Sequence, residues 1–95
     1  MKVVWTRKAR HHLRAAYDYW ADETSADSAH TMLGRIFSAV ERLEKFPEIG
    51  RRGRVAGTRE LVVVPTPFLI AYRAHPGKIE VLALLHGARK WPEKL

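Results

Sequence analysis

The sequence predicts a small α+β fold, a single domain spanning residues 1–95, in which an antiparallel helical hairpin packs on a curved, mainly antiparallel sheet. Residues 58–64, 68–75 and 78–86 are rich in β-branched, aliphatic and aromatic residues, and only short proline-containing breaks separate them. Residues 6–46 instead repeat apolar side chains at the spacing of an α-helix. With a short strand ahead of the helices, the expected order is β-α-α-β-β-β.

The N-terminal part is expected to form a strand and then an amphipathic helix. Lys2–Trp5 is a short β-prone run, and Thr6 stands where a helix N-cap would. The helix is expected to end near Asp22. Its apolar stripe consists of Ala9, Leu13, Ala16, Tyr17 and Trp20.

A second helix is expected after a connection of about three residues, a length typical of an antiparallel helical hairpin. Ser25 is its expected N-cap, and Phe46-Pro47 ends it, because the residue before a proline disfavours the helical conformation. Its buried stripe consists of Ala29, Met32, Leu33, Ile36, Val40 and Leu43. This hairpin is expected to cover one face of the sheet.

Composition narrows the functional classes. The chain has 95 residues, of which 46% are hydrophobic, enough for a modest single core. It contains no cysteine, which excludes disulfides, zinc–cysteine sites and thiol nucleophiles. We expect no metal and no cofactor. Because the first residues contain no apolar run of signal-peptide or membrane-spanning length, a cytoplasmic protein without a membrane partner is expected.

The charge is strongly positive and unevenly distributed. The formal net charge is +7 with a pI near 10.3, and the cations are concentrated at the start of the chain and in the strand-rich half. Such a surface attracts a polyanion or an acidic protein, although it also serves solubility. The cations of the first helix either meet a partner or form a solvated face. His11 and His12 point about 100° apart on a helix, so they are expected to be surface residues rather than a metal pair.

Two arginines and a histidine lie within the apolar runs. Side chains alternate between the faces of a strand, so Arg59 shares a face with Leu61, and Arg73 shares one with Leu69. His86 follows Leu84 on the last strand. Burying an unpaired guanidinium is costly, so both arginines are expected where a strand leaves the core and faces a groove. The sheet is therefore expected to carry a basic, histidine-bearing rim.

Two further segments concentrate cations. Arg51, Arg52 and Arg54 form a loop that either contacts phosphate groups or is simply solvated. Near the C-terminus, Arg89 and Lys90 precede Trp91, whose ring either stacks on a base or closes the end of the core. The phosphate-binding interpretation includes all six residues.

Four segments together resemble the RelE/ParE family of type II toxins. They are residues 54–62 (RVAGTRELV), 67–73 (PFLIAYR), 79–82 (IEVL) and 85–92 (LHGARKWP), in the family's order, and the resemblance covers nearly the whole chain. It implies a toxin that is neutralised by an antitoxin protein encoded by the neighbouring gene. It further implies a ribosome-dependent, metal-independent endoribonuclease that cleaves messenger RNA and halts translation. The alternative within the family is an inhibitor of DNA gyrase without nuclease activity.

RNA cleavage by a ribose 2′-hydroxyl needs a proton acceptor, a proton donor and positive charge beside the phosphorane. His86 is the candidate acid or base, and Arg59 and Arg73 are the candidate phosphate clamps, in places that match the nucleases of the family. Glu60 is a poorer base because it faces the opposite side of its strand from Arg59. The alternative for His86 is a structural histidine that closes the core. Some family nucleases carry a C-terminal tyrosine, and here no tyrosine follows Tyr72.

Overall fold

The computed structural model describes residues 2–87, and its helices begin at the two predicted caps. The hydroxyl oxygens of Thr6 and Ser25 each accept a hydrogen bond of 3.0 Å from the amide three residues on. These caps satisfy amides that the first turn of a helix leaves free. The elements are β1 (Lys2–Trp5), α1 (Arg7–Glu23), α2 (Ala26–Lys45), β2 (Arg51–Arg52), β3 (Arg59–Val62), β4 (Phe68–His75) and β5 (Lys78–His86).

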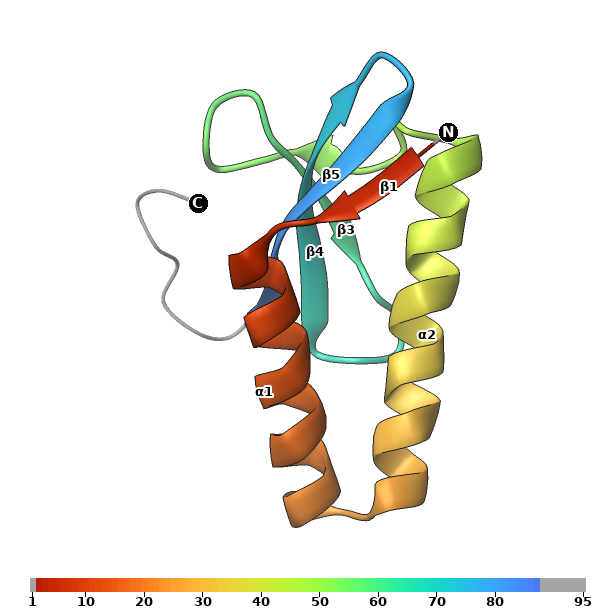
Figure 1. The fold of residues 1–95 in the computed structure, drawn as a ribbon, viewed down its shortest axis with the longest axis vertical. Helices are drawn as coiled ribbons and strands as arrows, with labels where there is room; N and C mark the ends of the chain where they lie inside the picture. Colours follow the sequence, from red (N-terminus) through yellow and green to blue (C-terminus); the bar gives the residue numbers. More distant parts are fainter. Residues whose placement is uncertain (1, 88–95) are drawn as a thin grey trace.

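The strands form one sheet in the order β1-β5-β4-β3-β2 (Figure 1). β1 runs parallel to β5, and every other pair is antiparallel, so the predicted sheet and its order along the chain are confirmed. One prediction was wrong, since Arg51 and Arg52 belong to a short edge strand rather than a loop. The Gly53 amide donates a 2.8 Å hydrogen bond to the Thr58 carbonyl, which closes a β2–β3 hairpin around the intervening residues.

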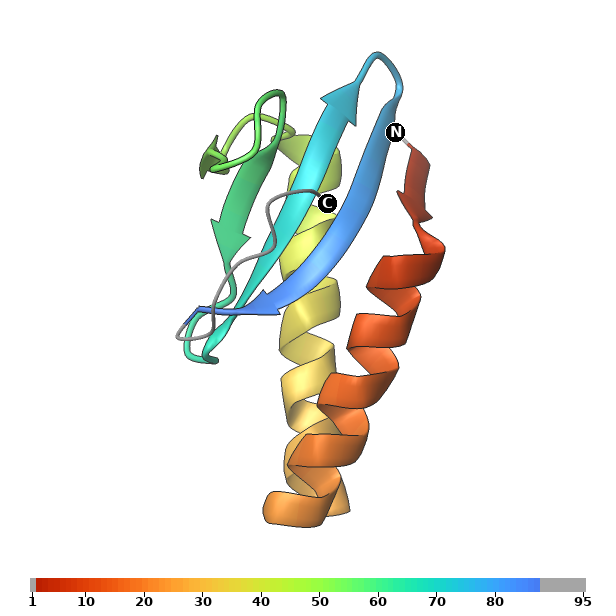
Figure 2. The same cartoon turned by 90° about the vertical axis from the view of Figure 1, so that its left-hand side faces the viewer.

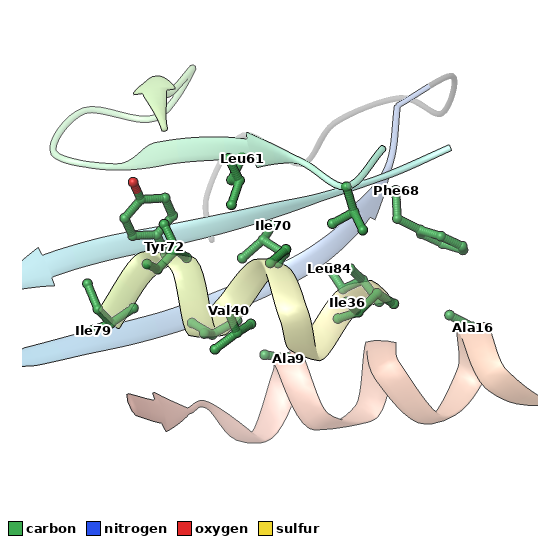
Figure 3. Close-up of a cluster of buried hydrophobic side chains, with 14 of the residues drawn as sticks. Ala9, Ala16, Ile36, Val40, Leu61, Phe68, Ile70, Tyr72, Ile79 and Leu84 are labelled. Atoms are coloured by element: carbon green, nitrogen blue, oxygen red, sulfur yellow. The ribbon is translucent and has the colours of Figure 1, made fainter. Parts of the chain in front are cut away.

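Both helices lie on the same side of the sheet (Figures 1 and 2). The core between these layers contains Ile36 and Val40 from α2 and Ile70 and Tyr72 from β4, all of them buried (Figure 3). Leu13 and Trp20 of α1 are partly buried against it, as the predicted stripe requires. We call the opposite side the outer face of the sheet. No helix in residues 2–87 is long and apolar enough to cross a membrane.

The first turns of α1 are fastened to β5. The Thr6 hydroxyl donates to the Leu82 carbonyl (3.1 Å), and the Leu84 amide donates to Nδ1 of His12 (3.3 Å). His12 is therefore half-buried and structural, which corrects the expectation that it is a surface residue, whereas its neighbour His11 is exposed. Helical periodicity placed His12 off the apolar stripe, but it did not indicate the backbone amide of β5 beside it.

Acidification is expected to destabilise the protein through His12. Burial, followed by the charges of Lys8 and His11, lowers the pKa of His12 below its ordinary value of 6.5. As the pH falls through about 6.5, the unfolded chain binds a proton at His12 before the folded protein does, so the folded state loses stability until the lower pKa is passed. A protonated Nδ1 also cannot accept the Leu84 hydrogen bond.

The matched variant is His12→Asn, whose Oδ1 can accept the same hydrogen bond without titrating. Urea unfolding at a series of pH values from about 7.5 to about 5 measures the effect. The free energy of unfolding should fall less steeply with acidification in the variant than in the parent. The other histidines are the same in both proteins, so their contributions to the pH dependence cancel in this comparison. Identical pH dependences would contradict a role for His12 in acid sensitivity.

Candidate functional site

A buried carboxylate organises the β2–β3 hairpin on the outer face. Glu60 is only 3% exposed, and its Oε1 lies 3.2 Å from both Nε and Nη2 of Arg51. Its Oε2 accepts a 2.9 Å hydrogen bond from the backbone amide of Arg54. Because a buried charge is costly unless it is paired and hydrogen-bonded, these three contacts explain how Glu60 is accommodated. They also determine where the arginine-rich hairpin sits.

The tip of the same hairpin approaches Arg73 on β4. Gly57 adopts a φ of +78°, a left-handed conformation that favours glycine, and a Cβ built there would lie 3.7 Å from Nε of Arg73. Arg73 is half-buried and faces Glu80 across the β4–β5 pair. It shares the outer face with Glu60, whose partner on β4 is Ala71. We call Arg51, Arg54 and Arg73 the basic cluster.

Arg59 faces the helix side of the sheet, opposite Tyr72 on β4. Its Nη1 donates to the carbonyl oxygens of Gly50 (2.9 Å) and Glu48 (3.2 Å). These bonds fasten the turn between α2 and β2 to the start of β3. Arg59 therefore has a structural role. Its guanidinium group binds backbone carbonyl oxygens and does not face a groove on the outer face, as had been expected from the sequence.

His86 ends β5 on the helix side. It faces Phe68 on β4, and the two rings meet edge to face with centroids 5.6 Å apart and an interplanar angle of 80°. Arg73 lies on the outer face and toward the other end of the β4–β5 hairpin, where Glu80 is its neighbour across the strand pair. Arg51 and the Arg54 amide therefore contact Glu60 on the outer face, which Arg73 shares, whereas His86 lies on the helix side.

The remaining predicted binding residues divide into two groups. Arg52 is exposed and faces Arg59 across the β2–β3 pair. The predicted contacts of Arg89, Lys90 and Trp91 lie outside the described residues. Within residues 2–87, no three histidine, aspartate or glutamate side chains are grouped as metal ligands would be.

Glu60 is the site residue whose importance sequence reasoning missed, since it was considered only as a weak base. The available signal was an acid in the middle of an arginine-rich hairpin and directly before an apolar run. An acid in that position needs cationic or amide partners if its strand is buried.

The sequence model that describes the ParE toxin of type II toxin–antitoxin systems, parDE, matches residues 3–91. The chain belongs to this family. The toxin RelE2 of Caulobacter vibrioides is 39% identical over 88 residues, covering 93% of this chain and 97% of that protein. A putative toxin, Y4kP, of Sinorhizobium fredii is 34% identical over 94 residues, covering 99% and 96% respectively.

Comparison with solved structures agrees with the membership of this chain in the ParE toxin family. A chain of the chromosomal ParDE system of P. aeruginosa superposes with a TM-score of 0.75 at 27% identity, covering 90% of this chain and 95% of that one. A YoeB/ParE toxin from Agrobacterium tumefaciens has a TM-score of 0.59 at 22% identity, covering 90% and 98%, which supports the fold alone. The predicted RelE/ParE family and fold are therefore confirmed, and membership implies an antitoxin partner.

Proposed function

We propose that this ParE-family toxin inhibits DNA gyrase by binding through its basic cluster and does not cleave RNA. The separation of Arg73 from His86 carries the proposal. A general acid or base must come within about 2.6–3.2 Å of the proton that it moves, and a phosphate clamp must reach the same phosphate. Side chains on opposite faces of a packed sheet do not meet this requirement. Binding through Arg51, Arg54 and Arg73 makes no such demand.

The second candidate is the ribosome-dependent nuclease, acting on messenger RNA. Two observations favour it: the cations of the basic cluster suit phosphate contacts, and a 39% identical relative is called a RelE toxin. In this candidate, Arg59, Arg73 and His86 keep their predicted catalytic roles. Arg52, Arg89, Lys90 and Trp91 remain predicted phosphate contacts under the same candidate.

The discriminating experiment compares two variants in two assays. Arg73→Gln is expected to weaken inhibition of gyrase supercoiling about tenfold, the scale of one lost charge-assisted contact, with a shallower salt dependence. His86→Gln is expected to inhibit as well as the parent. Neither of the two variants should cleave messenger RNA on translating ribosomes.

Arg14→Gln is the matched control, because it removes an equal charge from the exposed face of α1, where Arg14 pairs with Asp18. It should change gyrase inhibition little. In cells, DNA damage signalling should precede any halt in translation. Cleaved transcripts that disappear in His86→Gln, with gyrase unaffected by the parent, would replace the proposal with the nuclease.

A further inference from the structure

A hollow of about 500 Å³ lies between β1 and the two helices. Residues from all three elements line it, and they combine apolar residues with two cations: Val3, Trp5, Leu13 and Phe37, together with Lys2 and Arg10. β1 is the edge strand at one side of the sheet, and β2, where the basic cluster begins, is the edge strand at the other. The hollow is therefore a surface separate from the basic cluster.

An aromatic ring in this hollow is open to solvent. Phe37, on α2, is 43% exposed and is not part of the buried core. Its ring meets that of Trp5 edge to face, with centroids 6.0 Å apart and an interplanar angle of 69°. Lys2 and Arg10 line the same hollow. Sites for single-stranded nucleic acid combine these groups, because unpaired bases stack on aromatic rings while lysines and arginines contact the phosphates.

The cations continue from the hollow along α1. At about 100° per residue, Arg7 and Arg14 lie about 60° and 40° around the helix from Arg10, and all three residues are exposed. No acid precedes Asp18, which pairs with Arg14. Like charges three or four residues apart destabilise a helix, and so do cations near the positive end of its dipole. The stability of α1 therefore does not explain this arrangement, whereas an anionic partner does.

The positive charge also extends onto the sheet. Lys2 faces Lys78 directly across the β1–β5 pair, and both residues are exposed. Like charges in this position repel each other. The ion pairs found within residues 2–87 include neither lysine, and they do not include Arg10. Cations spread over α1, β1 and β5 suit a chain of phosphates better than a single anionic group.

We propose that this surface binds single-stranded DNA, with one base stacked on Phe37 and the neighbouring phosphates on Lys2 and Arg10. The bases of a duplex are stacked within the double helix and do not reach the ring. DNA is favoured over RNA because none of the side chains that line the hollow within residues 2–87 accepts the hydrogen bond of a ribose 2′-hydroxyl, so the hydroxyl would lose hydration without compensation. This binding is additional to gyrase inhibition and does not depend on it.

Phe37→Ala tests the stacking. Fluorescence anisotropy measures the affinity for a labelled oligothymidylate of about 12 nucleotides, a length within the usual range of such binding sites. We expect binding about tenfold weaker than in the parent, the scale of one lost stack. Phe37→Leu keeps an apolar group against Trp5 and should bind about as weakly, whereas Phe37→Tyr keeps the ring and should bind as the parent does. Parent-like affinity in both Phe37→Ala and Phe37→Leu would overturn the proposal.

Arg10→Gln tests the phosphate contact. It should weaken binding of the oligothymidylate and reduce the slope of log Kd against log salt concentration by about 0.7, the value for one phosphate contact on a single strand. Lys8→Gln is the matched control, because Lys8 is also an exposed cation of α1 but lies about 160° around the helix from Arg10. Its effect on both quantities should be smaller. Equal effects of the two variants would mean that the net charge of +7 alone attracts the DNA, and the proposed site would be rejected.

Other nucleic acids and the gyrase assay complete the test. The parent should bind oligothymidylate more tightly than oligouridylate of the same length, and Phe37→Ala should leave the binding of a DNA duplex unchanged. Tighter binding of oligouridylate would assign the surface to RNA and overturn the proposal for DNA. Phe37→Ala and Arg10→Gln should both inhibit gyrase supercoiling as the parent does. Loss of oligothymidylate binding from the parent itself, with gyrase inhibition intact, would reject this inference and leave the proposed function standing.

Discussion

Replacing Tyr72 by phenylalanine is expected to lower the free energy of unfolding by about 1–3 kcal/mol. Tyr72 is fully buried on β4. Its hydroxyl accepts a 2.9 Å hydrogen bond from the Gly50 amide and donates a 2.8 Å bond to the Pro47 carbonyl. Phenylalanine keeps the ring in the core and leaves both backbone groups without this partner, and the cost of a buried unsatisfied group exceeds the net gain of an average hydrogen bond.

Tyr17→Phe is the matched control for Tyr72→Phe. The Tyr17 hydroxyl also makes a 3.0 Å hydrogen bond, to Nε2 of His30, but that pair is exposed, so water replaces the lost partner. Urea unfolding should give a midpoint close to the parent for Tyr17→Phe and a clearly lower one for Tyr72→Phe. Equal midpoints for the two variants would show that the turn at Pro47 and Gly50 does not depend on Tyr72.

Much of the fold could be predicted because its determinants are local. The caps at Thr6 and Ser25 and the apolar period of α2 depend on residues within a few positions of one another. The strand β2 could not be predicted in this way. Its two arginines have no β-prone pattern, and they pair because the hairpin closes between Gly53 and Thr58. Tertiary pairing therefore overrides local propensity there.

The arrangement of the site depends on register, which the sequence of a single strand does not contain. The alternation of side chains along a strand correctly placed Arg73 on the same face of β4 as Leu69. It could not say that β4 and β5 pair Phe68 with His86 and Arg73 with Glu80, which puts the histidine and the arginine on opposite faces. The ladder also contains a register shift next to Ala71 and Tyr72. Relations between strands decide whether side chains meet, and those relations arise only in the assembled sheet.

Glu60→Ala is expected to disturb both stability and the basic cluster. The substitution removes a carboxylate that is 2% exposed in its side chain, leaves the Arg54 amide without its acceptor and releases Arg51. Breaking a buried ion pair costs about 3–5 kcal/mol, but the Arg51 side chain is 60% exposed and is re-solvated, so we expect a loss of about 2–3 kcal/mol. Thermal and urea unfolding measure it.

Two variants separate the anchoring role of Glu60 from its charge. Glu60→Gln retains an acceptor for the Arg54 amide but not the ion pair with Arg51, so its loss of stability should be smaller than that of Glu60→Ala. Asp18→Ala removes the exposed pair with Arg14 and should change stability by less than about 0.5 kcal/mol. If Glu60 positions the basic cluster, folded Glu60→Gln should also inhibit gyrase less well than the parent, although it gains positive charge. Stronger inhibition would mean that net charge, rather than the placement of Arg51 and Arg54, governs binding.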